Sequence, residues 1–185
     1  MAPTVLTLGH STRAIHELLA LVSEFGVTTL VDVRRFPSSR RHPHFNGPAL
    51  ARALHEIGVA YRHEPDMGGR REALPDSRNT AWRVAAFRGY ADHMASAAFR
   101  SALDRLRALA AGAAAGPPAI LCAEAVPWDC HRQLISDALV AGGMRVRHIL
   151  GAGRAEEHVL NASAVVGAEG VVMYPASGQR ALFRE

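Results

Sequence analysis

The sequence contains no lysine, so its 21 basic residues other than histidine are all arginines. The arginine guanidinium is a planar fork of N–H donors that suits phosphate and carboxylate groups. High-GC codon usage would produce the same composition, so the missing lysine alone assigns no partner. The formal net charge is only +4, but arginines occur in adjacent pairs at positions 34 and 35, 40 and 41, and 70 and 71.

Cysteine is scarce and long apolar runs are missing. The two cysteines, Cys122 and Cys130, belong to a chain of 185 residues, which is large enough to fold without cross-links. This usage indicates a reducing compartment, with the thiols kept for chemistry or for burial. A run of about 18 apolar residues and a charged-then-apolar signal pattern are both missing, so we expect a cytoplasmic protein without a membrane partner.

Strand-like and helix-like patterns of apolar residues alternate along the chain. They predict a single α/β domain over residues 1–185, built as a doubly wound, Rossmann-like, mostly parallel sheet of about five strands with helices on both faces. The regular part is expected over residues 5–150 and a less regular segment over 151–185, with a short helix at 155–166. The expected strands are residues 5–8, 28–33, 59–63, 119–121 and 144–150, with a last short strand or an extended tail at 170–175.

The chain is organised around the segment 120–132. A buried strand begins it, and Pro127 is expected in the first turn of the helix that follows, so both cysteines flank one strand-to-helix loop. In an open α/β sheet, ligands bind outside the carboxyl ends of the strands, where helix N-termini also point. We therefore expect residues 9–12, 32–46, 63–71 and 122–132 to meet at one edge of the sheet.

Candidate ligand-binding residues lie in these four segments. The turn at residues 9–12 offers small residues, two hydroxyls and free N–H groups to an anion. In the alternative interpretation, Ser11 and Thr12 only cap the next helix. The arginines of the two long loops are expected to form a positive rim. The candidates are Gly9, Ser11, Thr12, Arg34, Arg35, Arg40, Arg41, Phe45, Asn46, Gly68, Gly69, Arg70, Arg71 and Cys122.

Candidate catalytic residues are the polar groups at the strand ends. Asp32 closes a buried strand, where a carboxylate needs a partner, so it either pairs with Arg34 or takes part in catalysis. Cys130 is expected in the first helical turn beside a histidine and an arginine, which favours its thiolate. Cys122 is by default a small core residue. Glu124 either opposes the thiolate or orients the histidine as a base. The candidates are His10, Asp32, Glu124, Cys130, His131 and Arg132.

A metal site is the less favoured alternative. Cys122, Cys130 and His131, together with His10, carry donor atoms suited to zinc, but zinc sites more often carry tighter Cys-x2–4-Cys pairs. No cofactor is implied. A helical stretch that contains Trp82, Tyr90 and Met94 is spaced as a buried face, so these side chains are expected in the core rather than in a platform for base stacking.

Six ordered segments cover about residues 5–150: Thr7–Thr12, Val31–Ser39, His44–Asn46, Gly68–Arg71, Phe87–Met94, and Cys122-Ala123-Glu124 followed by Cys130-His131-Arg132. Together they resemble the hallmark segments of the domain-of-unknown-function family 488 (DUF488). The resemblance implies a compact α/β bacterial or archaeal protein with a shared site, and it implies no reaction, substrate or cofactor.

A second likeness points to thiol chemistry. Residues Val31–Arg34 also resemble the strand-end tetrapeptide of rhodanese sulfurtransferases, which place a catalytic cysteine in a loop ahead of a helix. The cysteine loop of this chain lacks the Cys-x4-Arg cradle with glycines of that family.

Three functions are compatible with these residues. The leading hypothesis is an enzyme, or an enzyme-derived binding protein, that holds a phosphorylated ligand such as a nucleotide or nucleic acid in an arginine-rimmed crevice. The second is a non-catalytic nucleic-acid-binding module in which arginines contact phosphates and the cysteines are structural. The third is a thiol-dependent transferase or redox protein. The sequence leaves the reaction and the oligomeric state open.

Overall fold

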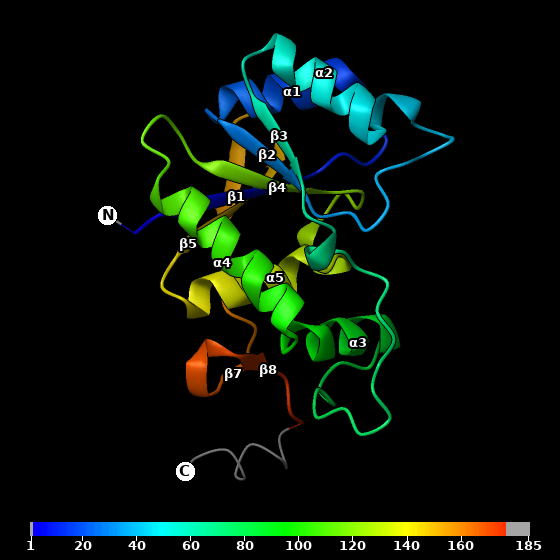
Figure 1. Ribbon diagram of the computed structural model, residues 1–185, viewed down its shortest axis with the longest axis vertical. Helices are drawn as coiled ribbons and strands as arrows, with labels where there is room; N and C mark the ends of the chain where they lie inside the picture. Colours follow the sequence, from blue (N-terminus) through cyan, green and yellow to red (C-terminus); the bar gives the residue numbers. More distant parts are fainter. Residues whose placement is uncertain (1, 177–185) are drawn as a thin grey trace.

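A computed structural model describes residues 2–176 and contains a six-stranded sheet with the strand order β3-β2-β4-β1-β5-β6 (Figure 1). Neighbouring strands are parallel, except that β6 runs antiparallel to β5. A separate two-stranded ribbon, β7 and β8, follows. The strands are β1 (Thr4–Gly9), β2 (Thr29–Asp32), β3 (Ala60–His63), β4 (Pro118–Cys122), β5 (Arg145–Gly151), β6 (Arg154–Glu157), β7 (Val165–Val166) and β8 (Val172–Met173).

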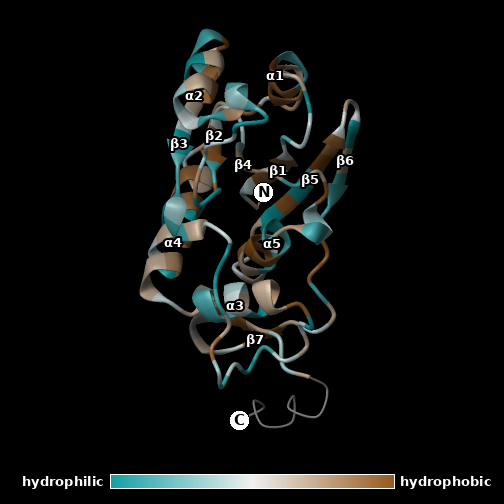
Figure 2. Ribbon diagram, turned by 90° about the vertical axis from the view of Figure 1, so that its right-hand side faces the viewer, coloured by the Kyte–Doolittle hydropathy of each residue, from teal (hydrophilic) through white to brown (hydrophobic). Residues whose placement is uncertain are grey.

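Helices cover both faces of the sheet. Helices α1 and α2 lie on one face and α4 and α5 on the other, while α3 lies further from the sheet beyond α5 (Figure 2). None of the helices in residues 2–176 is long and apolar enough to cross a membrane. The helices are α1 (Ile15–Glu24), α2 (Gly47–Glu56), α3 (Ala85–Met94), α4 (Ala97–Ala111) and α5 (Arg132–Ala141), and the short 3-10 turns are η1 (Pro43–Phe45), η2 (Pro65–Met67), η3 (Pro127–Asp129) and η4 (Ala168–Gly170).

The central strands supply side chains to two separate cores, because successive residues of a strand point to opposite faces. In β4, Ala119 and Leu121 pack with the apolar residues of α1 and α2, whereas Ile120 and Cys122 pack with those of α3, α4 and α5. Burial on both faces explains why the strands are continuous apolar runs. The predicted doubly wound, mostly parallel α/β fold is confirmed.

The parallel pairing brings the ends of three strands to the same level. Gly9, the last residue of β1, pairs with Cys122, the last residue of β4, and Asp32 of β2 pairs with Leu121. Gly26 and Gly58, which lie just after α1 and α2, have φ angles of 62° and 74°, which residues with a Cβ rarely adopt.

The predictions for residues 155–166 and for Trp82 are wrong. The helix expected at residues 155–166 is absent, because β6 pairs with β5 and β7 follows it; an ion pair of 2.6 Å joins Arg145 to Glu157 across the first pair. Trp82 precedes α3 instead of belonging to it, and it packs on Phe87 and Tyr174. The strand predicted at 170–175 is observed as β8. The rest of the C-terminal segment, from residue 177, lies outside the described residues.

Ser11 and Thr12 do not cap α1. The chain turns at Ser11, which has a φ of 49°, and the residue that caps α1 is Ala14. The N–H groups of His10 and Ser11 bond the carbonyl oxygens of Cys122 and Ala123. The turn therefore extends the pairing of β1 with β4, and these two N–H groups are not available to an anion.

Candidate active site

The carboxyl ends of β1, β2 and β4 open into a cavity of about 1050 Å³. Its walls come from the β1–α1 turn, the two long loops after β2 and β3, the N-terminal half of α3, and the β4–α5 loop. A volume of this order fits a small organic ligand. The candidate residues that line it are His10, Ser11, Thr12, Arg34, Arg35, Arg41, Gly69, Arg70, Cys122, Glu124, Cys130 and His131.

The remaining candidates lie behind or beside the cavity: Gly9, Asp32, Arg40, Phe45, Asn46, Gly68, Arg71 and Arg132. Other lining residues were not predicted. Most of them lie next to predicted residues in the same loops, so their position in those loops could have identified them from the sequence. Tyr90 was expected only in the core. The unpredicted lining residues are Phe36, Ser38, Ser39, His42, Val84, Ala86, Phe87, Tyr90, Ala123, Ala125 and Asp129.

Arg34 is fixed by a buried carboxylate. Its Nε and Nη2 donate to the two oxygens of Asp32 at 2.8 and 2.5 Å, and Asp32 also accepts from the hydroxyl of Tyr61 at 2.9 Å. Arg34 Nη2 further donates to the carbonyl of Phe45. Asp32 is fully buried, so these bonds compensate the cost of desolvating its charge. Of the two interpretations of Asp32, the geometry favours pairing with Arg34.

His10 is held as a neutral ring beside Arg34. Its Nδ1 lies 2.9 Å from the carbonyl oxygen of Ser11 and therefore donates, and its Nε2 accepts from Arg34 Nη1 at 3.3 Å. Burial, together with the charge of Arg34, lowers the pKa of His10 to about 4. These contacts, within residues 2–176, use four of the five N–H groups of Arg34, whose side chain also lines the cavity.

The two thiols lie at opposite ends of the β4–α5 loop. Cys122 is the last residue of β4, and Cys130 lies just before α5, which begins at Arg132. The prediction that Pro127 and Cys130 share the first turn of α5 is wrong, because Pro127 begins a separate 3-10 turn that ends at Asp129. Cys130 nevertheless accepts the backbone N–H of Arg132, at 3.5 Å, from the start of α5.

Arg132 is a buried cation next to Cys130. Its side chain is 1% exposed, and its Nε donates to Cys130 Sγ at 3.4 Å. Its Nη2 donates to the carbonyl oxygen of Glu124 at 2.6 Å. Among the side chains described, no carboxylate forms an ion pair with Arg132. A buried cation needs a counter-charge, and the sulfur of Cys130 is the group in place to supply it.

The surroundings shift the pKa values of the two thiols in opposite directions. Burial raises the pKa of Cys130, but hydrogen bonds from Cys122 and His131 and the charges of His131 and Arg132 outweigh it, and the pKa lies well below the ordinary thiol value. The pKa of Cys122 is raised well above that value, first because Cys122 donates its S–H to Cys130 and then because it is buried. The expected order of reactivity, Cys130 before Cys122, follows from these two opposite shifts.

His131 contacts both sulfurs through one nitrogen. Its Nε2 lies 3.2 Å from the carbonyl oxygen of Val33 and donates to it, which leaves Nδ1 facing Cys122 Sγ at 3.9 Å and Cys130 Sγ at 3.8 Å. The ring also packs on Tyr90. A Cβ on Gly69 would lie 2.9 Å from Nδ1, so the glycine makes room for this orientation.

Glycine is needed at a second point below the thiols. A Cβ on Gly9 would lie 1.7 Å from the carbonyl oxygen of Glu124 and 2.9 Å from Arg132 Nη2. The Glu124 carbonyl therefore holds Arg132 close to β1, while the Glu124 side chain is exposed at the cavity. His131 is oriented by the backbone of Val33, and the expected role of Glu124 in orienting it is not observed among its contacts.

Behind Cys130 lies a chain of buried hydrogen bonds. The carboxylate of Asp137 can only accept hydrogen bonds, so His158 Nε2 donates to it at 2.9 Å. His148 Nε2 in turn donates to His158 Nδ1, also at 2.9 Å. The hydroxyl of Thr7 completes the chain at His148 Nδ1. Burial and the nearby charges of His158 and Arg132 lower the pKa of His148 to about 4. The chain keeps His148 uncharged next to Arg132.

Comparison with known proteins identifies the family. Residues 14–139 match the model of the domain of unknown function DUF488, which is more than half of the chain. The chain belongs to the DUF488 family. The resemblance expected from the ordered motifs is thereby confirmed. No curated protein and no solved structure matches the chain.

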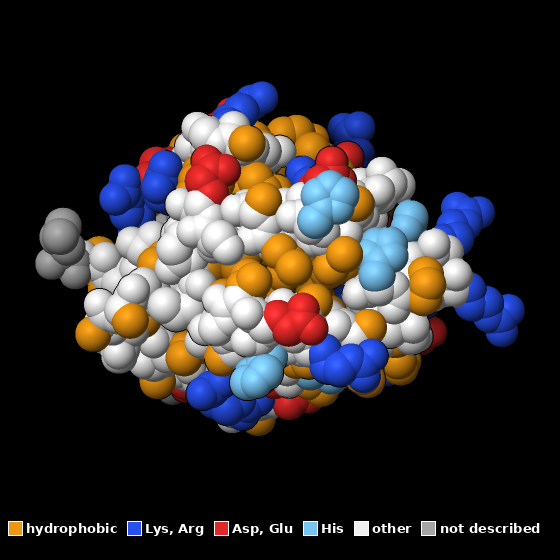
Figure 3. Space-filling view, turned by 90° about the horizontal axis from the view of Figure 1, so that it is seen from above, with side chains coloured by type: hydrophobic (Ala, Val, Ile, Leu, Met, Phe, Trp, Pro, Cys, Tyr) orange, Lys and Arg blue, Asp and Glu red, His pale blue; other side chains and the backbone are white. Residues whose placement is uncertain are grey.

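The arginines of the DUF488 chain divide into two groups at the cavity. Arg35, Arg41 and Arg70 line it with Arg34, and Arg35 Nη1 donates to the carbonyl oxygen of Arg70 at 2.9 Å. Arg71 turns to the carbonyl oxygens of Gly68 and Pro65 instead, and Arg40 lies outside the cavity lining. On the face seen in Figure 3, arginine side chains lie around the outline with acidic and histidine side chains between them.

The sulfurs of Cys122 and Cys130 and Nδ1 of His131 lie within 4.8 Å of one another, as the zinc alternative requires. A divalent ion bound there would meet the Arg132 guanidinium on the other side of Cys130. Because a cation already bonds Cys130, the geometry favours a free thiolate over a metal-bound one.

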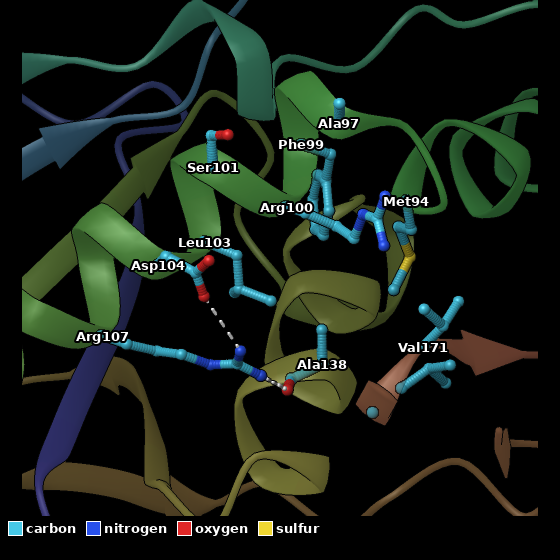
Figure 4. Close-up of a pocket in the computed structure, with 12 residues that line it drawn as sticks. Met94, Ala97, Phe99, Arg100, Ser101, Leu103, Asp104, Arg107, Ala138 and Val171 are labelled. Carbon is cyan, nitrogen blue, oxygen red and sulfur yellow. Dashed lines mark hydrogen bonds and ion pairs between the residues drawn. The ribbon is translucent and has the colours of Figure 1, made fainter. Parts of the chain in front are cut away.

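A second hollow of about 360 Å³ lies between α4, α5 and the segment around Val171 (Figure 4). There Arg107 joins the two helices: its Nη1 lies 3.3 Å from the Asp104 carboxylate of α4, and its Nη2 donates to the carbonyl oxygen of Ala138 of α5 at 3.0 Å. None of the candidate residues lines this hollow, and its contacts hold α4 against α5.

Proposed function

We propose that this DUF488 protein is a thiol-dependent enzyme in which the thiolate of Cys130 attacks a small anionic substrate bound in the arginine-lined cavity. The observation that carries the proposal is the buried Arg132, which bonds Cys130 and has no carboxylate partner among the side chains described. A thiolate balances this charge and is the nucleophilic form of cysteine.

The cavity supports an anionic substrate. Four arginines line it, namely Arg34, Arg35, Arg41 and Arg70, against the two carboxylates of Glu124 and Asp129. Arg34 is already held by Asp32, so its guanidinium lines the cavity from a fixed position and would lose little side-chain entropy on binding. A phosphorylated ligand such as a nucleotide belongs to the class that this lining fits.

The side chains take distinct roles. Cys130 is the nucleophile, and Arg132 with the backbone N–H at the start of α5 stabilises its negative charge. His131 Nδ1 exchanges a proton with the thiols. Asp32 is a positioning residue, because it acts on the substrate through Arg34, and His10 both bonds Arg34 and lines the cavity.

A small ligand is favoured over nucleic acid. A nucleic-acid-binding module presents its cations as a stripe or patch along the surface. On the α1 and α2 side of the molecule, which Figure 3 shows, the arginine side chains are separated from one another and form no stripe. The arginines of the site instead surround a concave space that ends at a thiol.

Alkylation with reagents of different charge tests the proposal. We expect iodoacetate and iodoacetamide to label Cys130 before Cys122 at neutral pH, as mapped by mass spectrometry. We also expect iodoacetate to label Cys130 faster than iodoacetamide does, when both rates are normalised to those with free glutathione, because the arginines attract the anion. The Cys130→Ser variant should lose the fast phase.

Three results would contradict the proposal. Equal slow labelling of both thiols would return Cys130 to a structural role, and a relative loss of iodoacetate would exclude an anionic substrate. Stoichiometric zinc that is retained by the purified protein, with both thiols protected until a chelator is added, would make the cysteines metal ligands instead.

A further inference from the structure

We propose that Cys122 is the resolving cysteine of a two-thiol cycle, and that the site performs thiol–disulfide exchange with a small disulfide that carries carboxylates. The inference rests on the proposed function, since it takes Cys130 as the attacking thiol. It adds the class of reaction, the class of substrate and a chemical role for Cys122.

The two sulfurs are placed to react with each other. They lie within 4.8 Å of each other, with no other side chain needed to bring them together. Both are free thiols, and both contact the same nitrogen of His131. A disulfide requires the sulfurs to approach to about 2.05 Å. Cys130 lies between η3 and α5 and outside both, so its side chain can make this approach without breaking a helix.

The charges around the thiols favour attack in a fixed order. While Cys130 is a thiolate, it holds the proton of Cys122 in a hydrogen bond and opposes a second negative charge. When Cys130 becomes part of a disulfide, that negative charge is gone, while Arg132, whose charge already lowers the pKa of Cys122, remains. The same buried cation therefore favours the thiolate of Cys130 first and that of Cys122 second.

In the first step, the Cys130 thiolate attacks one sulfur of the substrate disulfide R–S–S–R. The bond between Cys130 Sγ and that sulfur forms as the S–S bond of the substrate breaks, and one thiolate, R–S⁻, leaves with the Nδ1 proton of His131 as R–SH, which frees Nδ1. The protein then carries a mixed disulfide on Cys130. The departing anion is formed in a cavity lined by Arg34, Arg35 and Arg41, which stabilise it.

In the second step, Cys122 gives its proton to His131 Nδ1, which is 3.9 Å from its sulfur, and the Cys122 thiolate attacks Cys130 Sγ. The new Cys122–Cys130 disulfide forms, the mixed disulfide breaks, and the second R–S⁻ leaves with the proton from His131 as R–SH. The two protein thiols are oxidised by two electrons, and the substrate disulfide is reduced to two thiols.

Carboxylates on the substrate follow from the lining. The two sulfurs are buried in the lining of the cavity, with Cys130 2% exposed, and Arg35, Arg41 and Arg70 line the same cavity from the two long loops. A disulfide whose reactive sulfur sits at Cys130 must extend its substituents past these arginines. Carboxylate groups on those substituents would form charge-assisted hydrogen bonds there.

Three disulfides of different charge test the proposal: oxidised glutathione, which is anionic, hydroxyethyl disulfide, which is neutral, and cystamine, which is cationic. With oxidised glutathione the wild-type protein should end with an internal Cys122–Cys130 disulfide and no bound glutathione, measured by mass spectrometry. The Cys122→Ser variant should stop with one glutathione on Cys130, and Cys130→Ser should take up none. The rate should be highest for oxidised glutathione after normalisation to a small free thiol.

The outcomes separate the inference from the proposed function. A wild-type protein that keeps one glutathione on a fast-reacting Cys130 would overturn the resolving role of Cys122 and leave the thiol enzyme standing. A faster reaction with cystamine would overturn the anionic substrate class. A Cys130 that reacts with neither disulfides nor alkylating reagents would overturn both. The disulfide state of the wild-type protein is measured without any variant, so it tests the resolving role of Cys122 even if a substitution impairs folding.

Discussion

Two buried arginines lie at the carboxyl edge of the sheet, and different groups balance their charges. Arg34 is 7% exposed and paired with the Asp32 carboxylate, which also accepts a bond from Tyr61. Arg132 is 1% exposed and bonds a sulfur and carbonyl oxygens. The first arginine is neutralised within the fold, whereas the second makes Cys130 its counter-ion.

The difference assigns different tasks to the two halves of the site. On the Arg34 side, the charge is already paired with Asp32, and we propose that the arginine anchors a ligand from this fixed position. On the Arg132 side, we propose that the charge is balanced when Cys130 is ionised and that the fold stabilises a nucleophile there. A protein that needed its thiols only for packing would gain nothing from a buried guanidinium beside one of them.

The largest expected effect is on the Arg34 side. The Asp32→Asn variant leaves Arg34 buried without an anion, which should lower the free energy of unfolding by about 3–5 kcal/mol in denaturant titrations. Glu157→Gln, which removes the partner of the exposed Arg145, is the matched control and should change stability far less. A loss in Asp32→Asn as small as that of the control would show that the carboxylate does not neutralise Arg34.

Acid should destabilise the fold through two buried histidines. His10 and His148 have pKa values of about 4 in the fold against 6.5 ordinarily, so the unfolded chain binds more protons between these values. The contribution of each histidine to the free energy of unfolding should therefore be complete above pH 6.5. It should fall towards pH 4 by at most about 1.4 kcal/mol per pH unit for each histidine. Denaturant titrations between pH 4 and 6.5 should show that the free energy of unfolding depends less steeply on pH in His148→Gln than in the wild type. An unchanged pH dependence in that variant would contradict the lowered pKa of His148.

Removing the second arginine should change reactivity. In Arg132→Gln the Cys130 thiolate loses its buried cation, so its pKa should rise and alkylation at pH 7 should slow about tenfold or more, with recovery at alkaline pH. Arg132→Lys keeps the charge and should restore part of the rate. A pH–rate profile for Arg132→Gln that matches the wild type would mean that Arg132 does not stabilise the thiolate.

The smallest effect separates two neighbouring arginines. Arg41 lines the cavity and Arg40 does not. Arg41→Gln should lower the ratio of iodoacetate to iodoacetamide rates at Cys130 by about two- to threefold, because one exposed charge is partly screened by salt. Arg40→Gln should leave that ratio unchanged. Equal effects of the two substitutions would place the attraction in the overall charge of the protein and not in the cavity.

The sequence was sufficient to predict that the site lies at one edge of the sheet. The carboxyl ends of parallel strands meet at one edge, so Asp32 and Cys122 could be placed there from the strand pattern alone. Strand β6 was missed because its four residues, Arg154–Glu157, show no apolar alternation. The place of Cys130 was missed because Pro127 suits the first turn of a 3-10 helix as well as that of an α-helix.

The burial of Arg132 could not be predicted either. A charged residue beside His131 would ordinarily be exposed. It is buried because Gly9, far away in the sequence, leaves room for the guanidinium against β1. Contacts of this kind depend on the pairing between β1 and β4, and they cannot be predicted from local sequence patterns.

The central claim is that Arg132 holds Cys130 as a thiolate. The groups that face Cys130 and enter its titration are Cys122 on β4, Tyr90 on α3, His148 on β5, and His131 and Arg132 at the start of α5. The most direct test is a pH titration of the thiolate ultraviolet absorbance in the wild type, Cys130→Ser and Cys122→Ser. One thiolate should ionise well below the ordinary thiol pKa in the wild type and in Cys122→Ser, and this step should be absent from Cys130→Ser. Two thiols that both ionise at or above the ordinary value in the wild type would contradict the claim.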